Sequence, residues 1–321
     1  MIRYIIRRIL WAVVLFIAVT AITYIIFFII PADPARLACG QRATPECVKM
    51  ARHFLGLDRP VPVQYGMFLK RLVVDHSLGR SFTNRLSVNY VIGHAAPVTA
   101  SLVFGGAVLW MLLAIPVGVF SALRPRSLMD RIAMIFVLIG ISAHPVWIGL
   151  LFAYFFGFKL GLTPITGYAN FFGGGVGPAG PVQWAYHLIL PWTTFMILFA
   201  ALYVRMIRAN TMETLNEDFV RTARAKGAPE WVVLRSHVLR NSMLPIVTML
   251  GMDIGIALGG AVFTETVYGL PGLGKTLVNS INTFDLPTTM GIVVFTTLSI
   301  IVFNLIVDLL YAWIDPRIRL A

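Results

Sequence analysis

The sequence predicts an all-α membrane protein with six transmembrane helices and both termini in the cytoplasm. Its composition, its six long apolar runs and the distribution of its basic residues predict this class. Of the 321 residues, 58% are hydrophobic and 12% are charged, and the mean hydropathy is +0.81. Soluble domains carry about 45–50% apolar and about 25% charged residues. The composition therefore excludes an ordinary water-soluble globule, and it equally excludes a disordered chain.

Six apolar runs are long enough to cross a membrane. The first, Ile9–Ile30, has 22 uncharged residues, and a helix rising about 1.5 Å per residue spans a hydrocarbon core about 30 Å thick over that length. The apolar core of a signal peptide is shorter, so we expect a retained span. The other runs are Thr99–Leu123, Ile132–Phe158, Trp184–Val204, Leu244–Phe263 and Thr289–Ile314. We expect bundled helices to tolerate Pro116, Pro145 and Pro191 within or near these spans.

The basic residues orient the chain. The 26 Lys and Arg exceed the 14 Asp and Glu, for a net charge of +12. A cytoplasmic N-terminus places most of these cations inside, namely Arg3, Arg7, Arg8, Arg124, Arg126, Arg131, Arg317, Arg319 and the basic stretch Arg205–Arg240. The short outer loops hold only Lys159 and Lys275, as the positive-inside rule requires, and the long outer segment 31–96 counts little because long segments cross regardless of charge. The charge therefore predicts topology rather than nucleic-acid binding.

The predicted spans divide the chain into three parts. Residues 1–30 form the N-terminus and first transmembrane helix, residues 31–96 an extracytoplasmic segment, and residues 97–321 a five-helix core with a cytoplasmic loop at 205–245.

The extracytoplasmic segment contains two predicted helices and both cysteines. Thr44, with a proline and an acid directly after it, is typical of a helix start, so we expect a helix through Phe54, and Val61–Val74 reads as a second, amphipathic helix. Because this compartment is oxidising, Cys39 and Cys47 could form a disulfide, although two free buried thiols would also fit.

The cytoplasmic loop has the pattern of short helices. Thr214 and Glu217 stand in the relation of a capping box, and Leu215, Phe219 and Ala223 recur at a spacing that places them on one helix face. This apolar stripe fits an element that docks onto a partner, and it also fits a plain amphipathic loop.

A glycine interrupts this loop. Gly227 stands where a helix ends in a left-handed residue, and Pro229 is suited to the first position of the next helix. We therefore expect two short helices joined at Gly227.

This loop resembles the EAA loop of permeases of binding-protein-dependent ABC importers, and the dipeptide/oligopeptide permease group is the closest resemblance. The similar loop residues are Glu217–Gly227, His237–Asn241 and Leu244-Pro245. The resemblance covers the whole chain through Ala43–Glu46, Leu55–Pro60, Val63–Tyr65, Glu265–Tyr268, Pro271–Gly274, Asn304, Asp308, Tyr311 and Asp315–Arg317. The chain departs from the family at the triplet that names the motif, which here is Arg221-Thr222-Ala223.

The resemblance implies a type I ABC importer permease bundle in the bacterial plasma membrane, which translocates di- or oligopeptides by alternating access. It implies four kinds of partner: a second permease, a paralogue of this chain; two cytoplasmic ABC ATPases; an extracytoplasmic solute-binding protein; and membrane lipid. ATP and Mg would bind to the ATPases, and this chain would bind no cofactor or metal and hold no catalytic residue. The residues implied in coupling to the ATPases are Glu217, Asp218, Phe219, Arg221, Ala223, Arg224, Gly227, His237 and Asn241. Nickel, glutathione or haem are alternative cargoes within the same family.

One segment imitates a nucleotide-binding motif. Residues Gly269–Thr276 match the P-loop pattern letter by letter, but a P-loop lies between a strand and a helix and binds nucleotide with backbone N–H groups. Here the segment follows an expected span, lies on the outer side, and contains Pro271, which has no N–H. We interpret it as a hairpin that turns back toward the helix bundle.

Several polar residues fall within the apolar runs. Asp253 lies near the middle of the fifth run, where an aspartate costs about 2.5–3.5 kcal/mol on insertion scales and so must face the bundle or water. Asn304 and Asp308 share a face of the sixth run, Glu265 ends the fifth, and His144 lies in the third. These residues either line a translocation path or lock helices together through hydrogen bonds worth about 0.6 kcal/mol each. Proton binding at the acids would instead indicate an ion-coupled secondary transporter.

Overall fold

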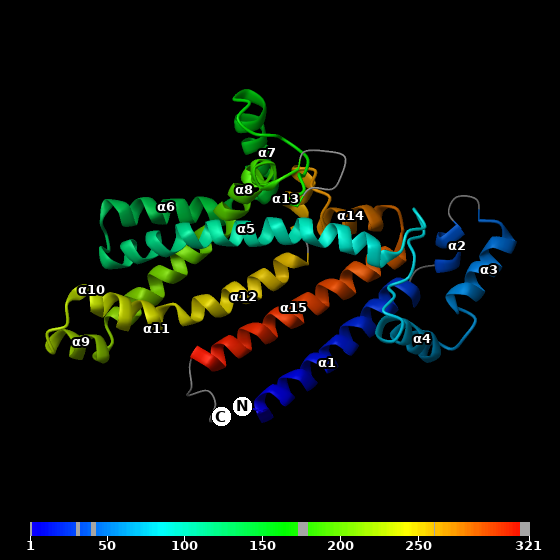
Figure 1. Cartoon of the computed structure of the whole chain (residues 1–321), viewed down its shortest axis with the longest axis horizontal. Helices are drawn as coiled ribbons and strands as arrows, with labels where there is room; N and C mark the ends of the chain where they lie inside the picture. Colours follow the sequence, from blue (N-terminus) through cyan, green and yellow to red (C-terminus); the bar gives the residue numbers. More distant parts are fainter. Residues whose placement is uncertain (1, 30–32, 40–42, 173–178, 260, 315–321) are drawn as a thin grey trace. The chain divides into compact units, whose positions relative to one another are not determined.

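The computed structural model describes residues 2–29, 33–39, 43–172, 179–259 and 261–314, and all the regular elements in these ranges are helices (Figure 1). Two compact units form. One comprises residues 1–100, 255–265 and 271–305, and the other comprises residues 101–254, 266–270 and 306–321. Each unit draws on segments that are far apart in the sequence, because long helices pass from one unit into the other.

The first unit contains the N-terminal span and the outer segment. Its helices are α1 (Ile2–Tyr24), continued by a π-helical turn at Ile25–Ile29, α2 (Pro34–Cys39), α3 (Pro45–Leu55), α4 (Val61–Val73), the start of α5 (Val88–Leu123), most of α13 (Val262–Val267), α14 (Leu273–Asn282) and most of α15 (Leu286–Ile314). Two apolar clusters hold this unit together. In one, Val88 and Ile92 of α5 pack against Leu273 and Ile292, and the other joins α1, α4 and α15.

The second unit is arranged around the long helix α8 (Pro181–Leu215). It also contains the rest of α5, α6 (Leu128–Ser142), α7 (Pro145–Phe152) with a π-helical end at Ala153–Lys159, α9 (Asp218–Ala225), α10 (Glu230–Val232), a π-helical segment at Val233–Leu239, α11 (Arg240–Ser242) and most of α12 (Leu244–Leu258). Small residues let helices approach α8 closely: an added Cβ at Gly118 would lie 2.8 Å from side-chain atoms of Ile207. Trp110 of α5 stacks on Phe199 of α8, with ring centroids 4.6 Å apart.

The described helices have the length and apolarity of a multi-pass membrane protein. Four are long and apolar enough to cross a membrane, and the number rises to six if each of two bent helix pairs is one span. All six predicted runs therefore correspond to helical segments, although two of them are not single straight helices.

The predicted third span is broken at its proline. α6 ends at Ser142 and α7 begins at Pro145, with a bend of 107° between the two segments. His144 caps α7, because its Nδ1 accepts a hydrogen bond from the Val146 N–H at 3.3 Å. Pro145 therefore begins a new helix instead of lying within a continuous one, because a proline disfavours helical geometry in the residue before it and fits the first position of a new helix. Pro116 and Pro191, in contrast, lie inside α5 and α8.

The predicted fifth span also ends early. α12 stops at Leu258, where Gly259 closes the last turn by donating its N–H to the Ile256 carbonyl at 3.0 Å. Phe263, the expected end of the span, lies instead in the short helix α13.

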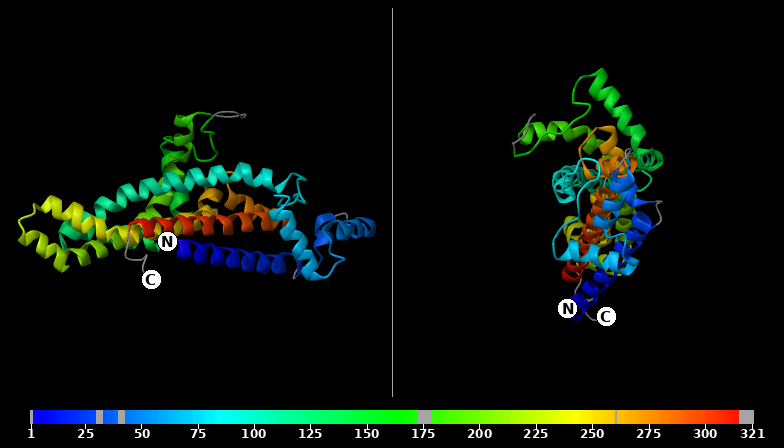
Figure 2. Two further views of the ribbon diagram at one scale, coloured as in Figure 1. Left: turned by 60° about the horizontal axis from the view of Figure 1, so that its bottom comes forward. Right: turned by 90° about the vertical axis from the view of Figure 1, so that its right-hand side faces the viewer.

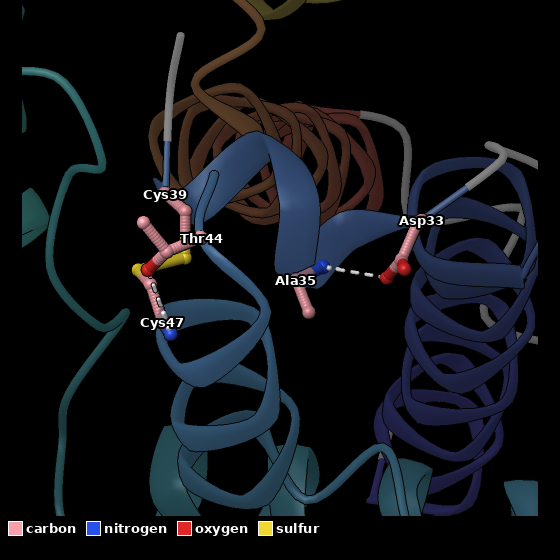
Figure 3. Close-up of a disulfide and its surroundings, with 5 residues drawn as sticks. All are labelled: Asp33, Ala35, Cys39, Thr44 and Cys47. Carbon is pink, nitrogen blue, oxygen red and sulfur yellow. Dashed lines mark hydrogen bonds between the residues drawn. A yellow bond between two sulfur atoms is a disulfide. The ribbon is translucent and has the colours of Figure 1, made fainter. Parts of the chain in front are cut away.

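The outer segment follows the sequence prediction closely. The Thr44 hydroxyl accepts a hydrogen bond from the Cys47 N–H at 3.3 Å and so caps α3 (Figure 3). α3 ends at Gly56, which has a left-handed φ of 72°, and α4 begins at Val61 as expected. The structure joins Cys39 at the end of α2 to Cys47 in the first turns of α3 by a disulfide (Figure 3).

We predict that this disulfide forms in the membrane-embedded protein. In preparations made without reductant, neither Cys39 nor Cys47 should react with an alkylating reagent, and both should react after reduction. Mass spectrometry of the alkylated peptides measures this directly. Cys39→Ser is the control and should leave Cys47 reactive without reductant, whereas alkylation of both thiols in the unreduced wild-type protein would contradict the prediction.

Candidate functional site

The best candidate site in the second unit is the hairpin of residues 217–241, which follows α8. Figures 1 and 2 show α9 and the segment after it folded back beside each other beyond the C-terminal end of α8. Glu217 is the residue before α9, but its side chain makes no capping hydrogen bond. The predicted capping box is therefore wrong. Thr214 still belongs to α8, so its hydroxyl donates to the carbonyl of Asn210 at 2.8 Å, four residues back in the same helix.

Four buried apolar residues hold the two arms of the hairpin together. Val220 and Ala223 of α9 pack against Val233 and Val238 of the following segment. Leu215 packs against the edge of this cluster. The hairpin is therefore a packed element with a core of its own rather than an extended loop.

The apolar stripe predicted for α9 is only partly correct. Ala223 is buried as expected, but Phe219 is 41% exposed, and Val220 takes the buried position beside it. The buried face of α9 differs from the predicted one because the helix begins at Asp218 and turns Val220 and Ala223 toward the second arm of the hairpin.

The turn between the two arms depends on one glycine. Gly227 has a left-handed φ of 80°, as its position in the sequence predicts. Its N–H donates to the Arg224 carbonyl at 2.9 Å, and the Ala228 N–H donates to the Ala223 carbonyl at 3.2 Å, so the last carbonyls of α9 are satisfied as in a glycine-terminated helix. Pro229 precedes α10 as its cap rather than occupying its first turn.

An ion pair bridges this turn. The guanidinium of Arg224 donates through Nε to Glu230 Oε1 at 2.8 Å and through its Nη2 to Oε2 at 3.3 Å. This two-point geometry fixes the direction of both arms. Because both side chains are largely exposed, the pair adds specificity of shape more than stability.

The outer surface of the hairpin combines apolar and charged side chains. Phe219, Trp231 and Val232 are exposed, Trp231 by 66%, while Asp218 and Arg221 lie 3.6 Å apart as a loose ion pair. His237 is half-buried, and its carbonyl accepts a hydrogen bond from the exposed Asn241 amide at 2.9 Å. The structure thus gathers the nine residues implied in coupling onto one hairpin, with Ala223 in its core.

A buried ion pair lies where α8, α5 and α6 meet, and the sequence reasoning missed it. Arg208 of α8 donates to both oxygens of Asp130, at 2.7 and 3.0 Å. The same carboxylate accepts hydrogen bonds from the Ser121 hydroxyl and from the Arg126 N–H. Asp130 caps the α5–α6 turn, and Arg208 lies two helical turns before the end of α8. One signal could have revealed it: an acid, Asp130, at the very start of an otherwise apolar span.

The polar residues predicted inside the spans have different surroundings. Asp253 is half-buried and accepts a hydrogen bond from the Tyr203 hydroxyl at 2.6 Å. The side-chain oxygen of Asn304 is buried and has no hydrogen-bond partner among the described residues. Asp308 lies in α15, but its side chain is outside the described part of the structure. His144 acts as the cap of α7.

Glu265 of α13 is fully buried in the first unit, and its carboxylate reaches the turn that imitates a P-loop. Its carboxylate accepts hydrogen bonds from the Thr99 hydroxyl at 2.7 Å and from the Lys275 N–H at the start of α14 at 2.9 Å. A Cβ added at Gly272 would collide with this carboxylate. The helix N-terminus that would face a phosphate in a P-loop therefore already binds the chain's own acid, and a helix, α13, precedes it instead of a strand.

These features define a class: a multi-pass helical membrane protein. In the ranges the structure describes, no group of three or more His, Cys, Asp or Glu side chains is placed to hold a metal ion.

The chain belongs to the family of binding-protein-dependent transport system inner membrane components. The family profile matches residues 114–320, and the profile of the family's N-terminal region matches residues 1–103. The protein is therefore a permease subunit of an ABC transporter, located in the bacterial inner membrane, and is not itself an enzyme.

Relatives with assigned names agree with this family. The chain is 37% identical to the probable D,D-dipeptide transport system permease protein of Escherichia coli (strain K12), over 98% of this chain and 97% of the relative. It is 34% identical to a putative peptide transport system permease protein of Brucella abortus (strain 2308), over 98% of both chains. It is also 34% identical to the glutathione transport system permease protein of Pectobacterium atrosepticum, over 99% of both chains.

We predict that Asp130 and Arg208 stabilise the protein as one unit. Arg208→Ala should lower the free energy of unfolding by about 3–5 kcal/mol, because it leaves the buried Asp130 carboxylate without its charged partner. Asp130→Ala should cost less, because the Arg208 side chain is 25% exposed and can be hydrated. The double variant should lose clearly less than the sum of the two single variants. Unfolding of the detergent-solubilised protein measures all three. Arg205→Ala removes an exposed cation from the same helix and should change little, and additive losses at Asp130 and Arg208 would contradict the prediction.

Proposed function

We propose that the chain forms half of the translocation pathway of a peptide importer and that the hairpin of residues 217–241 is the surface gripped by a partner ATPase. The observation that carries this proposal is the hairpin itself. It has a packed core, a fixed turn, and exposed apolar side chains at Phe219, Trp231 and Val232. Large apolar groups on a rigid polar element mark a contact surface for another protein. The peptide cargo rests on the names of the relatives, which include peptide and glutathione permeases.

The proposed topology has six spans with both termini in the cytoplasm, so that the hairpin faces the ATPase and the outer segment 31–96 faces the solute-binding protein. In this arrangement the bent pair α6 and α7 counts as one span. α12 supplies the fifth span, and the segment before it belongs to the cytoplasmic hairpin. Residues 1–30 supply the first span and residues 97–321 the permease core. A type I bundle of this size gives one half of a pathway, and a paralogous permease would give the other. ATP and Mg would bind to the two ATPase subunits and not to this chain.

The hairpin is built to transmit force to the membrane helices. Because its buried core resists deformation, a displacement of α9 by the ATPase moves the hairpin as one body. α8 runs unbroken from Pro181 to Leu215, and only two residues separate its end from the start of α9. The Arg208–Asp130 pair joins α8 to the α5–α6 turn, so the motion reaches three helices. This is the physical basis we propose for alternating access.

The candidates for the translocation path are Asp253, Glu265, Asn304 and Asp308. Asp253 and Asn304 are the stronger candidates, because Asp253 is partly exposed and the Asn304 oxygen has no partner among the described residues. Glu265 fits a structural lock better, since two hydrogen bonds already occupy its buried carboxylate.

We predict that Gly227→Val uncouples ATP hydrolysis from transport. A residue with a Cβ costs roughly 1–2 kcal/mol in left-handed geometry, and a β-branched one is worse. A Cβ at Gly227 would meet no atom within 4 Å, so the effect comes from the backbone alone. Peptide uptake in vesicles containing the assembled complex should fall at least about tenfold, while basal ATP hydrolysis remains and loses its stimulation by the binding protein.

Gly227→Asn is the matched control, because asparagine adopts left-handed geometry more readily, and it should retain most of the uptake. Wild-type uptake and stimulation in an assembled complex carrying Gly227→Val would refute the proposed role of the turn.

A further inference from the structure

A cavity of about 650 Å³ lies in the first unit, outside the hairpin and the polar residues discussed above. It is lined by the end of α1 and its π-helical turn, the disulfide-linked α2 and α3, α4, the chain at residues 77–85 and the start of α15. The disulfide of Figure 3 forms part of its wall. Nothing in the transport mechanism above uses this cavity.

Part of the cavity lining is apolar and aromatic. Tyr24 stacks on Phe28 with ring centroids 5.0 Å apart, and Phe68 of α4 lies 5.8 Å from Tyr24. Met290 of α15 packs in the same cluster. Tyr24, Phe68 and Met290 are at most 8% exposed and form a packed apolar floor. Phe28 and the exposed Met50 are the accessible apolar side chains of the lining, and they suit a hydrocarbon chain.

The lining also contains three arginines, and behind it the buried carboxylate of Asp285 accepts hydrogen bonds from the lining residues Ser81 and Phe82. Arg71, Arg80 and Arg85 line the cavity, and their side chains are exposed. No Asp or Glu is among the described lining residues, and none of the described carboxylates forms an ion pair with these three arginines. Three unpaired guanidinium groups around one cavity favour an anion, and arginine in particular binds phosphate with two parallel hydrogen bonds.

The position of the cavity indicates where this anion comes from. The part of α1 that reaches the cavity exposes Ile22, Ile25 and Ile26 by 46–56%, and it belongs to an apolar segment that is long enough to cross the membrane. The cavity therefore lies where a lipid-facing helix meets the polar outer segment. At this level a membrane presents phosphate groups directly above acyl chains.

We propose that this cavity binds an anionic phospholipid. Its phosphate contacts Arg71, Arg80 and Arg85, and one acyl chain lies along Phe28 and Met50, above the buried Tyr24 and Phe68. The bound lipid fills the cavity and so ties the outer segment to the membrane. A peptide carboxylate would offer the same negative charge to the arginines, but a site that opens beside a lipid-facing helix is supplied first by the bilayer.

The test is native mass spectrometry of the purified transporter complex, incubated with phosphatidylglycerol or, separately, with phosphatidylcholine of the same acyl chains. The wild-type complex should retain phosphatidylglycerol in preference to phosphatidylcholine. A triple variant with Arg71→Gln, Arg80→Gln and Arg85→Gln should retain at least about fivefold less phosphatidylglycerol. The control variant carries Lys49→Gln, Arg59→Gln and Lys70→Gln. It loses the same charge from the same outer segment but leaves the cavity lining intact, and it should bind like the wild type.

A second variant tests the apolar side independently of charge. Ala51→Phe places a bulky side chain at the cavity wall and should also reduce retained phosphatidylglycerol, with all three arginines in place. Equal retention of both lipids by the wild type, or unchanged phosphatidylglycerol in the arginine variant, would overturn the proposal. Displacement of bound phosphatidylglycerol by an acidic dipeptide at micromolar concentration would also overturn it, because the site would then belong to the peptide.

Discussion

The proposed coupling to an ATPase depends on the contact between α9 and the segment 233–239. Together they bury Val220, Ala223, Val233 and Val238. This contact is small, but it changes what the loop between α8 and α12 can do. A solvated loop of this length would absorb an applied displacement by changing its own shape. A hairpin with a core, a left-handed glycine at its turn and an ion pair across that turn passes the displacement on to α8. The mechanical role proposed for the loop therefore follows from burial of these four side chains.

The rest of the second unit is arranged to receive such a displacement. α8 has no break between the hairpin and the close contacts it makes with α5 and α6. The carboxylate of Asp130 is satisfied from three directions, by a side chain of α8, a hydroxyl of α5 and a backbone N–H of the intervening turn. A buried charge of this kind holds its geometry because any loss of a partner is costly. In the first unit, the buried carboxyl group of Glu265 holds the turn before α14 by accepting hydrogen bonds from the Thr99 hydroxyl and the Lys275 N–H.

The sequence revealed those features that depend on local chemistry. Thr44 and Gly56 mark the ends of α3 because a hydroxyl cap and a left-handed glycine act within one helical turn. Gly227 was predicted for the same reason. The number of apolar runs and the rejection of the P-loop match could also be predicted from the sequence, since both follow from composition and from the neighbouring residues.

The sequence did not predict, or predicted wrongly, those features that depend on packing between segments. Phe219 and Val220 differ in burial only because α9 meets a second segment, which no pattern within α9 specifies. Pro145 and Pro191 have the same local chemistry, yet one begins a helix and the other lies inside one, so the surroundings decide between them. Asp130 and Arg208 are 78 positions apart in the sequence. No local pattern around either residue predicts that they pair with each other.

The most direct test of the central claim is the side of the membrane on which the hairpin lies. A single cysteine at Phe219, in a chain with Cys39 and Cys47 replaced by serine, is exposed to a membrane-impermeant maleimide in intact cells and again after permeabilisation. The account predicts labelling only after permeabilisation, and weaker labelling when the ATPase subunits are co-expressed than when the permease subunit is expressed without them. Labelling of the same cysteine in intact cells would place the hairpin outside, where no ATP-driven partner could reach it, and would contradict the account.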